Sequence, residues 1–230
     1  MNHDYPGLED FNGIVRLFPL PNLVLFPFVM QGLHIFEPRY RQMTADAQAD
    51  DRLITIALLQ PGWETEYHGL PPLYPVACVG RIVADQRLDD GRYNLQLRGV
   101  SRVRLVKEIE NGKLYRGARV EVLNDIPVDS PDTEQALRRR LAVTVPKWCP
   151  SHEPGASVFR KLLKSKIPLG IVCDMIGSVL PLPIEAKRQL LEIFDVERRA
   201  GQLLHFLETG TPTVPEEPSS MKFPPDFSDN

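Results

Sequence analysis

Cys149 and His152 come closest to a reactive pair in this 230-residue sequence. A thiolate beside an imidazole is a workable arrangement for a nucleophile or for a metal ligand pair. A zinc site needs about four converging ligands, and the other cysteines and histidines show no paired spacing around these two residues. We therefore interpret Cys149 as a loop residue beside Trp148, and we predict no catalytic residue and no metal site.

The sequence also lacks the motif of a nucleotide-binding site. The sequence has no Gly-x-x-x-x-Gly-Lys-Ser/Thr loop, whose backbone amides and lysine would hold the phosphates of a nucleotide. The adjacent Ser165 and Lys166 have no supporting context and are interpreted as surface residues. We therefore expect no cofactor and no ATP hydrolysis, and we do not predict an enzyme.

One candidate partner-binding group lies near a predicted helix start. It consists of Glu37, Arg39 and Tyr40. A carboxylate at a helix start and a charged pair would serve stability equally well, and we favour that structural interpretation over contact with a partner.

A second candidate group is aromatic and lies in the long loop predicted for residues 60–75. It consists of Trp63, Tyr67 and Tyr74. Aromatic side chains offer a large contact area at little entropic cost, as interface anchors do. Packing of the loop onto the rest of the fold is the alternative that we favour.

Basic clusters are few. They are Arg98, Arg102 and Arg104, together with the run at 138–140. They would suit RNA, but the formal net charge is -3 and acidic residues lie beside them, so a solvated strand and helix face is the preferred interpretation. Nucleic acid is not the expected partner.

The composition is that of an ordinary soluble globular protein, with 43% hydrophobic and 25% charged residues. No uncharged apolar stretch reaches the roughly 20 residues that cross a bilayer, and the first residues do not resemble a secretory signal. The three cysteines, Cys78, Cys149 and Cys173, suit reduced thiols better than disulfides. We expect a cytoplasmic protein that does not engage a membrane.

The first part of the chain is predicted to be β. Tyr93, Leu95 and Leu97 alternate with polar residues after the Asp90-Gly91 turn, and Asn111-Gly112 indicates a hairpin between runs at 103–109 and 114–122. Further strands are expected at 14–18, 23–26, 53–59 and 76–84, and one helix is expected to begin at Pro38. The strands should pair antiparallel in a small barrel.

From about residue 132 the period of the apolar residues changes to that of a helix. Leu137, Leu141 and Val145 indicate the first helix, and further apolar stripes follow in the segments 158–163, 175–180, 190–194 and 203–207. Pro183 is expected to start one of these helices, and Asp195 is expected to cap the last. The sequence thus predicts an α+β fold in which a small helical bundle follows the β region.

The predicted organisation has four parts. An N-terminal extension covers residues 1–13, the β domain residues 14–127, the helical bundle residues 128–208 and a flexible tail residues 209–230. The last part is rich in proline and poor in periodic apolar residues.

Several separated motifs occur in an order that resembles one family. They are 17–27 (LFPLPNLVLFP), 33–41 (LHIFEPRYR), Val79-Gly80, Asp90-Gly91, 99–102 (GVSR), 115–122, 175–182 and 187–207. This series, over roughly residues 14–208, is similar to the N-terminal, or substrate-binding, domain of Lon proteases.

The resemblance implies a β-rich fold related to PUA domains, followed by helices and used to engage proteins. It implies a non-catalytic, proteolysis-related recognition module that binds unfolded polypeptide or a protein partner, in contrast to the ATPase and Ser-Lys protease domains of Lon. An RNA-binding PUA-like protein is the alternative, because such barrels often hold RNA.

Overall fold

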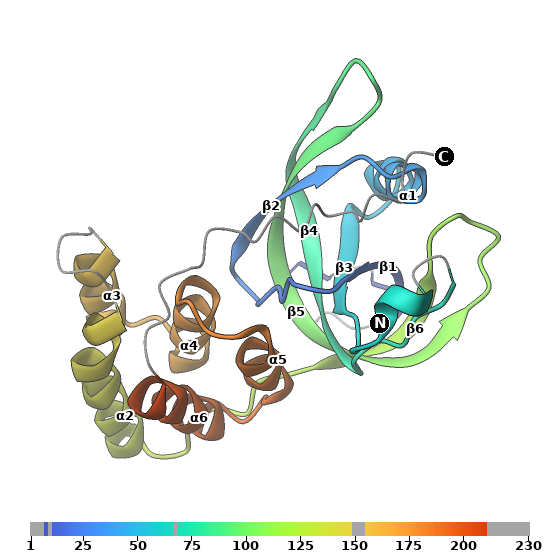
Figure 1. Cartoon of the computed structure of the whole chain (residues 1–230). Helices are drawn as coiled ribbons and strands as arrows, with labels where there is room; N and C mark the ends of the chain where they lie inside the picture. The colour runs from blue at the N-terminus through green and yellow to red at the C-terminus, as the bar shows by residue number, and fades with distance from the viewer. Residues whose placement is uncertain (1–6, 9–10, 67–68, 149–154, 211–230) are drawn as a thin grey trace.

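The computed structural model describes residues 7–8, 11–66, 69–148 and 155–210, and a β part and a helical part lie side by side in it (Figure 1). The strands are β1 (Ile14–Leu20), β2 (Met30–Ile35), β3 (Leu53–Leu58), β4 (Val76–Arg87), β5 (Tyr93–Ile109) and β6 (Gly117–Leu123). The helices are α1 (Pro38–Gln48), α2 (Pro131–Thr144), α3 (Gly155–Lys164), α4 (Leu169–Val179), α5 (Ile184–Glu192) and α6 (Val196–Thr209), with 3-10 helices η1 (Trp63–Glu66) and η2 (Val145–Trp148). The predicted α+β class is confirmed. No helix in these described ranges is long and apolar enough to cross a membrane.

The six strands form one sheet in the order β2-β5-β4-β3-β1-β6, and β6 returns to pair with β5. Five strands therefore close a barrel, as predicted. The pairing is not antiparallel throughout, because β1 runs parallel to β3. The chain between these two strands is long enough to hold β2 and α1, which is the kind of crossover that a parallel pair requires.

β2 lies outside the closed ring and pairs with the first half of β5, from Met30 opposite Arg98 to Ile35 opposite Tyr93. The strand predicted at 23–26 is wrong, since these residues have no strand pairing. Leu25 and Phe26 are nevertheless fully buried. Their apolar character reflects side chains that fill the core, which a sequence pattern does not distinguish from a buried strand.

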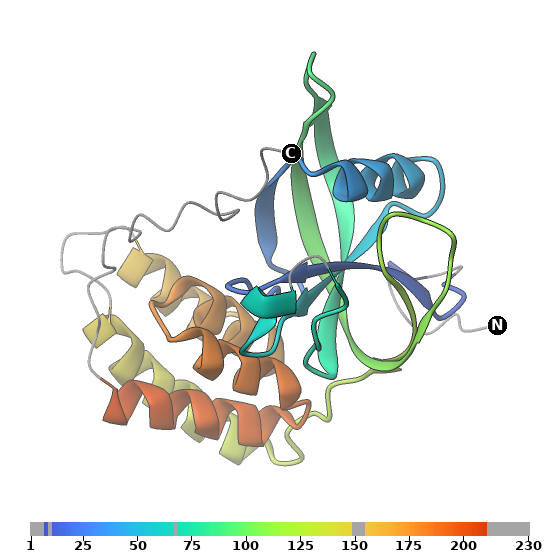
Figure 2. The same ribbon diagram turned by 45° about the vertical axis from the view of Figure 1, so that its right-hand side comes forward.

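β5 is a single long strand, where the sequence predicted two shorter ones. It pairs with β4 from Tyr93 to Arg104 and with β6 from Arg102 to Ile109. Both predicted turns flank it and have the positive φ that they need, 82° at Gly91 and 66° at Gly112. The β4–β5 hairpin extends beyond the barrel on the side away from the helices (Figure 2).

The helices begin and end largely as their capping signals predicted. α1 has Pro38 in its first turn, α5 follows Pro183, and the Asp195 carboxylate accepts a 2.9 Å hydrogen bond from the Arg198 amide at the start of α6. The expected stripe on α4 is partly wrong, because Val179 is exposed. The division of the chain at residue 127 stays a prediction.

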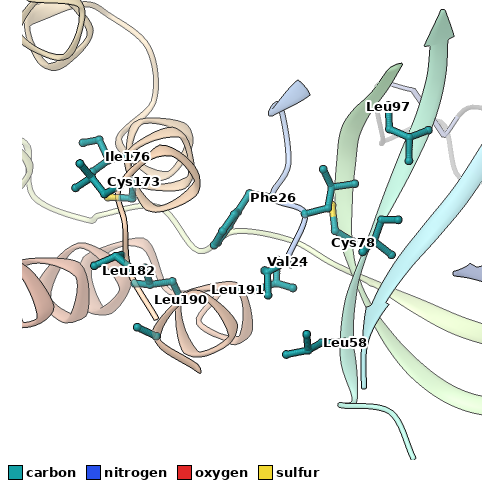
Figure 3. Packing of buried hydrophobic residues seen from close by; sticks show 14 of the residues in the cluster. Val24, Phe26, Leu58, Cys78, Leu97, Cys173, Ile176, Leu182, Leu190 and Leu191 are labelled. Atoms are coloured by element: carbon teal, nitrogen blue, oxygen red, sulfur yellow. The ribbon is translucent and has the colours of Figure 1, made fainter. Parts of the chain in front are cut away.

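One hydrophobic core runs through both parts. Phe26 lies between side chains of α4 and α5 on one side and side chains of the sheet on the other (Figure 3). Cys173 and Leu190 belong to the same buried cluster as Cys78 and Leu97. The helices therefore complete the core of the β part.

A buried ionic network also joins the two parts. Arg102 of β5 is 2% exposed, and its guanidinium donates two hydrogen bonds to the Asp174 carboxylate of α4, at 2.9 and 2.5 Å, and one to the Leu191 carbonyl. Arg199 of α6 donates to Asp174 at 2.8 Å. Its Nη2 lies 2.6 Å from the Asp125 carboxylate.

The two carboxylates keep this network ionised. Burial alone would lower the pKa of Arg199, but the charges of Asp174 and Asp125 outweigh burial, so its pKa is raised. Since the network has two cations and two anions, its charges balance only while all four residues are present.

Replacing Asp174 with alanine should lower the free energy of unfolding by about 3–5 kcal/mol, because two buried guanidinium groups lose their shared partner. Urea denaturation measures the change. The control is Glu208→Ala, which breaks the exposed 2.9 Å pair with Arg140 and should cost at most about 1 kcal/mol. Equal effects of the two substitutions would contradict a structural role for the network.

Candidate polypeptide-binding surface

A strained turn leads from the buried segment at 23–26 into β2. The Val29 amide donates to the Phe26 carbonyl at 3.3 Å, with Pro27 and Phe28 at the centre of the turn, and Phe28 has a φ of 64°. Proline fixes a negative φ at the first central position, so the turn is of type II, which normally has glycine at the second. A bulky aromatic residue there costs roughly 1–2 kcal/mol of local strain.

Gly99 of β5 holds this turn in place. The Phe28 amide donates to the Gly99 carbonyl at 2.8 Å, and the Gly99 amide donates to the Val29 carbonyl at 2.9 Å. A Cβ atom at position 99 would collide with the Phe26 carbonyl. Only glycine therefore allows this approach of the two backbones.

The turn displays two large apolar side chains. Phe28 is 54% exposed, and Met30, at the start of β2, is 51% exposed. Phe28 lies on a cavity of about 290 Å³ between the β part and the helices, beside Leu123 and Ile171. Strain and exposure at one aromatic residue point to a function in binding, because neither favours folding.

A second cavity, of about 320 Å³, lies beside β2, and we call it the motif groove. It is lined by Phe18, Leu20, Asn22, Leu23, Leu33, His34, Ile35, Phe36, Glu37 and Tyr40. The lining is mostly apolar, and the volume is at the lower end of the range for ligand pockets, roughly 300–1,000 Å³. The family-like motifs at 17–27 and 33–41 therefore fold around one hollow.

The first candidate partner-binding group, Glu37, Arg39 and Tyr40, comes together at the start of α1. Arg39 pairs with Glu37 at 2.9 Å, and its guanidinium lies 4.6 Å from the centre of the Tyr40 ring. Tyr40 is itself buried and packs against Phe18, so it forms the floor of the motif groove. The contacts of these residues are largely structural, and partner binding by them stays a prediction.

The described residues of the second candidate group, Trp63 and Tyr74, do not form one aromatic face. Tyr74 is half-buried under the guanidinium of Arg188 on α5, 4.4 Å from the ring centre. Trp63 is half-buried in η1, and Tyr67 lies outside the described residues. Partner binding by this group also stays a prediction.

The arginine cluster is only partly the solvated face that the sequence suggested. Arg98 and Arg104 are exposed, and Arg104 lies 3.6 Å from Glu121, but Arg102 is buried in the ionic network. Long side chains on a strand leave no pattern that tells a buried arginine from an exposed one, so sequence reasoning missed the network.

Cysteine chemistry has little support in the described residues. Cys78 and Cys173 are free and buried, and burial raises the pKa of each thiol to about 12. Neither supplies a thiolate at neutral pH. Cys149 and His152 lie outside the described residues.

Sequence reasoning also missed Phe28 and Met30. Prolines in the segment at 19–27 signal a break in the strand, but nothing in the sequence marks which apolar residues near it are exposed. The pairing of β2 decides that, because it turns Leu33 and Ile35 inward and leaves Met30 outside.

The family model of the ATP-dependent protease La (LON) substrate-binding domain matches residues 14–209. Lon protease 2 of Myxococcus xanthus is 29% identical over 208 residues, which are 88% of this chain and 24% of that protein. Lon protease 2 of Herpetosiphon aurantiacus is 31% identical over 189 residues, 81% of this chain and 23% of that protein. The chain thus spans about a quarter of the length of these relatives.

Solved structures share the fold. A Lon N-terminal domain protein from Xanthomonas campestris has a TM-score of 0.58 at 24% identity, covering 84% of this chain and 98% of that one. The N-terminal domain of the Mycobacterium avium complex Lon protease has a TM-score of 0.67 at 15% identity, covering 86% of this chain and all of that one.

Replacing Gly99 with alanine should destabilise the protein by about 1–3 kcal/mol, because the new methyl group forces the Phe26 turn away from β5. Thermal or urea unfolding measures this change. Gly201→Ala is the matched control, since a Cβ in that part of α6 meets nothing within 4 Å, and it should stabilise the helix by up to about 1 kcal/mol. A neutral Gly99→Ala would refute the close approach.

Proposed function

We propose that this chain, which belongs to the family of Lon substrate-binding domains, acts as a protein-recognition module that binds polypeptide and does not itself catalyse a reaction. The family match over residues 14–209 carries this proposal. The module would act in proteolysis by holding substrate, in the cytoplasm.

The exposed apolar side chains support this role. Phe28 and Met30 are both exposed and lie two residues apart, and Phe28 lines the cavity at the helices. Unfolded polypeptides differ from folded proteins in exposing apolar side chains, so a surface that offers apolar contacts selects them.

Binding should depend on these two side chains. The double variant Phe28→Asn, Met30→Ser should weaken binding of a permanently unfolded protein, such as reduced and carboxymethylated lactalbumin, by at least about tenfold, because two large apolar contacts are lost. Asparagine tolerates the positive φ at position 28, so the fold should persist. Fluorescence anisotropy of the labelled unfolded protein measures the affinity.

The control variant carries the substitutions Leu114→Ser and Val143→Ser, at side chains that are 65% and 67% exposed elsewhere on the surface. It should bind as tightly as the original chain. Equal weakening in both variants would show that binding is not localised here, and no binding by the original chain would refute the proposed function.

A further inference from the structure

We propose that the bound polypeptide adds to the sheet as a strand along the open edge of β2, with apolar residues facing the motif groove and acidic residues on its other face. This inference rests on the proposed function, and it specifies the conformation and the chemistry of the bound segment.

The backbone of β2 offers hydrogen bonds along that edge. The Val29 carbonyl accepts from β5, so alternation along the strand directs the backbone groups of Gln31, Leu33 and Ile35 to β5 as well. The amides and carbonyls of Met30, Gly32 and His34 then point away from β5, toward the open edge of β2. An extended backbone is the ligand that matches this row of donors and acceptors.

The contact at Gly32 agrees with this direction. Its carbonyl accepts a 2.9 Å hydrogen bond from the side-chain amide of Gln31, which a carbonyl engaged in the sheet would not need. A flexible, exposed side chain is readily displaced by a backbone donor.

The end of β4 shows the contrast. β4 also has an outer edge beyond the β3 pairing, and Arg52 covers its first residue: the Arg52 carbonyl accepts from the Ile82 amide at 2.8 Å, and the Arg52 guanidinium donates to the Ile82 carbonyl at 3.1 Å. Arg52 also pairs with Asp85 at 2.7 Å. No backbone hydrogen bond of this kind covers β2 among the described residues.

The space beside the edge is apolar on one face. Leu33 and Ile35 of β2 line the motif groove together with Leu20 and Leu23 of the segment across from them. Alternate side chains of an added strand would lie on this face, since neighbouring strands share the same alternation. Leucine, valine or isoleucine at every second position fits this lining.

The opposite face carries the positive charge of Arg98. Met30, Gly32 and His34 are exposed there, opposite Arg98, Gln96 and Asn94 of β5, and these six positions include no carboxylate. Arg98 makes no ion pair within the described ranges, whereas Arg92, whose guanidinium lies 3.3 Å from the His34 ring, is paired with Asp90 at 2.6 Å. Glutamate or aspartate at the intervening positions of the added strand complements the charge of Arg98.

The decisive probe is a fluorescein-labelled peptide in which leucine and glutamate alternate. Two derivatives carry N-methyl groups either on the leucine amides or on the glutamate amides, so that each loses one set of backbone donors. One derivative should bind at least about tenfold more weakly to the full chain, because only one set faces β2, and the other should bind as the parent does.

The matching protein variant is Gly32→Pro, which removes one outward amide and is compatible with an edge strand. It should weaken binding of the parent peptide several-fold. Gly32→Ala keeps the amide, and its Cβ meets only the Gln96 side chain at 3.4 Å, so it should bind normally. Circular dichroism establishes folding, and the peptide derivatives decide the question on the unaltered chain if Gly32→Pro does not fold.

The outcomes separate the two proposals. If the chain binds unfolded protein but binds the alternating peptide weakly, or binds both N-methylated derivatives equally well, strand addition at β2 is wrong and the proposed function stands. If the chain binds neither unfolded protein nor peptide, both proposals fail. Selective loss with one derivative supports the strand.

Discussion

β5 pairs with β4 along one edge. Its other edge can pair with only one strand at each position, and the arrangement of the remaining strands depends on this constraint. Up to Arg98 that edge belongs to β2, and from Arg102 it belongs to β6. Gly99 lies at the division and receives the backbone of the Phe26 turn. β2 therefore branches from the barrel and keeps a free edge, while the turn that begins it displays Phe28.

The same division directs Arg102 toward the helices. Burying a guanidinium costs several kcal/mol unless carboxylates and carbonyls surround it, and here α4, α6 and the Leu191 carbonyl do so. Apolar contacts such as those of Phe26 tolerate sliding, whereas bidentate hydrogen bonds fix an orientation. The hydrophobic core thus provides most of the attraction between the two parts, and the network sets the angle at which they meet.

Sequence alone predicted what local patterns and ordered motifs encode. The Gly91 and Gly112 turns, the proline-started helices and the Asp195 cap follow from backbone preferences of single residues. The prediction of a strand at 23–26 was wrong because a buried segment without strand pairing has the same apolar sequence pattern as a buried strand. The candidate site was predicted only in part. The motif that contains Tyr40 does line a groove. The exposure of Phe28 and the packing of Tyr74 on α5 depend on contacts between distant parts of the chain, which local sequence patterns do not encode.

A free strand edge is a hazard, because it can pair with another copy of the chain, and proteins usually cover such edges or place charge on them. In this chain Arg52 covers Ile82 at the edge of β4, while β2 is short and has charge on one face and an apolar groove on the other. β2 is only six residues long, and pairing of two copies along this edge would bring the Arg98 side chain of each copy toward that of the other. Pairing between two copies is therefore disfavoured. A polypeptide with acidic residues meets no such repulsion, and its backbone supplies hydrogen bonds whatever its side chains are. The edge therefore combines backbone hydrogen bonds for an added strand with protection against self-association, as the proposed binding of polypeptide requires.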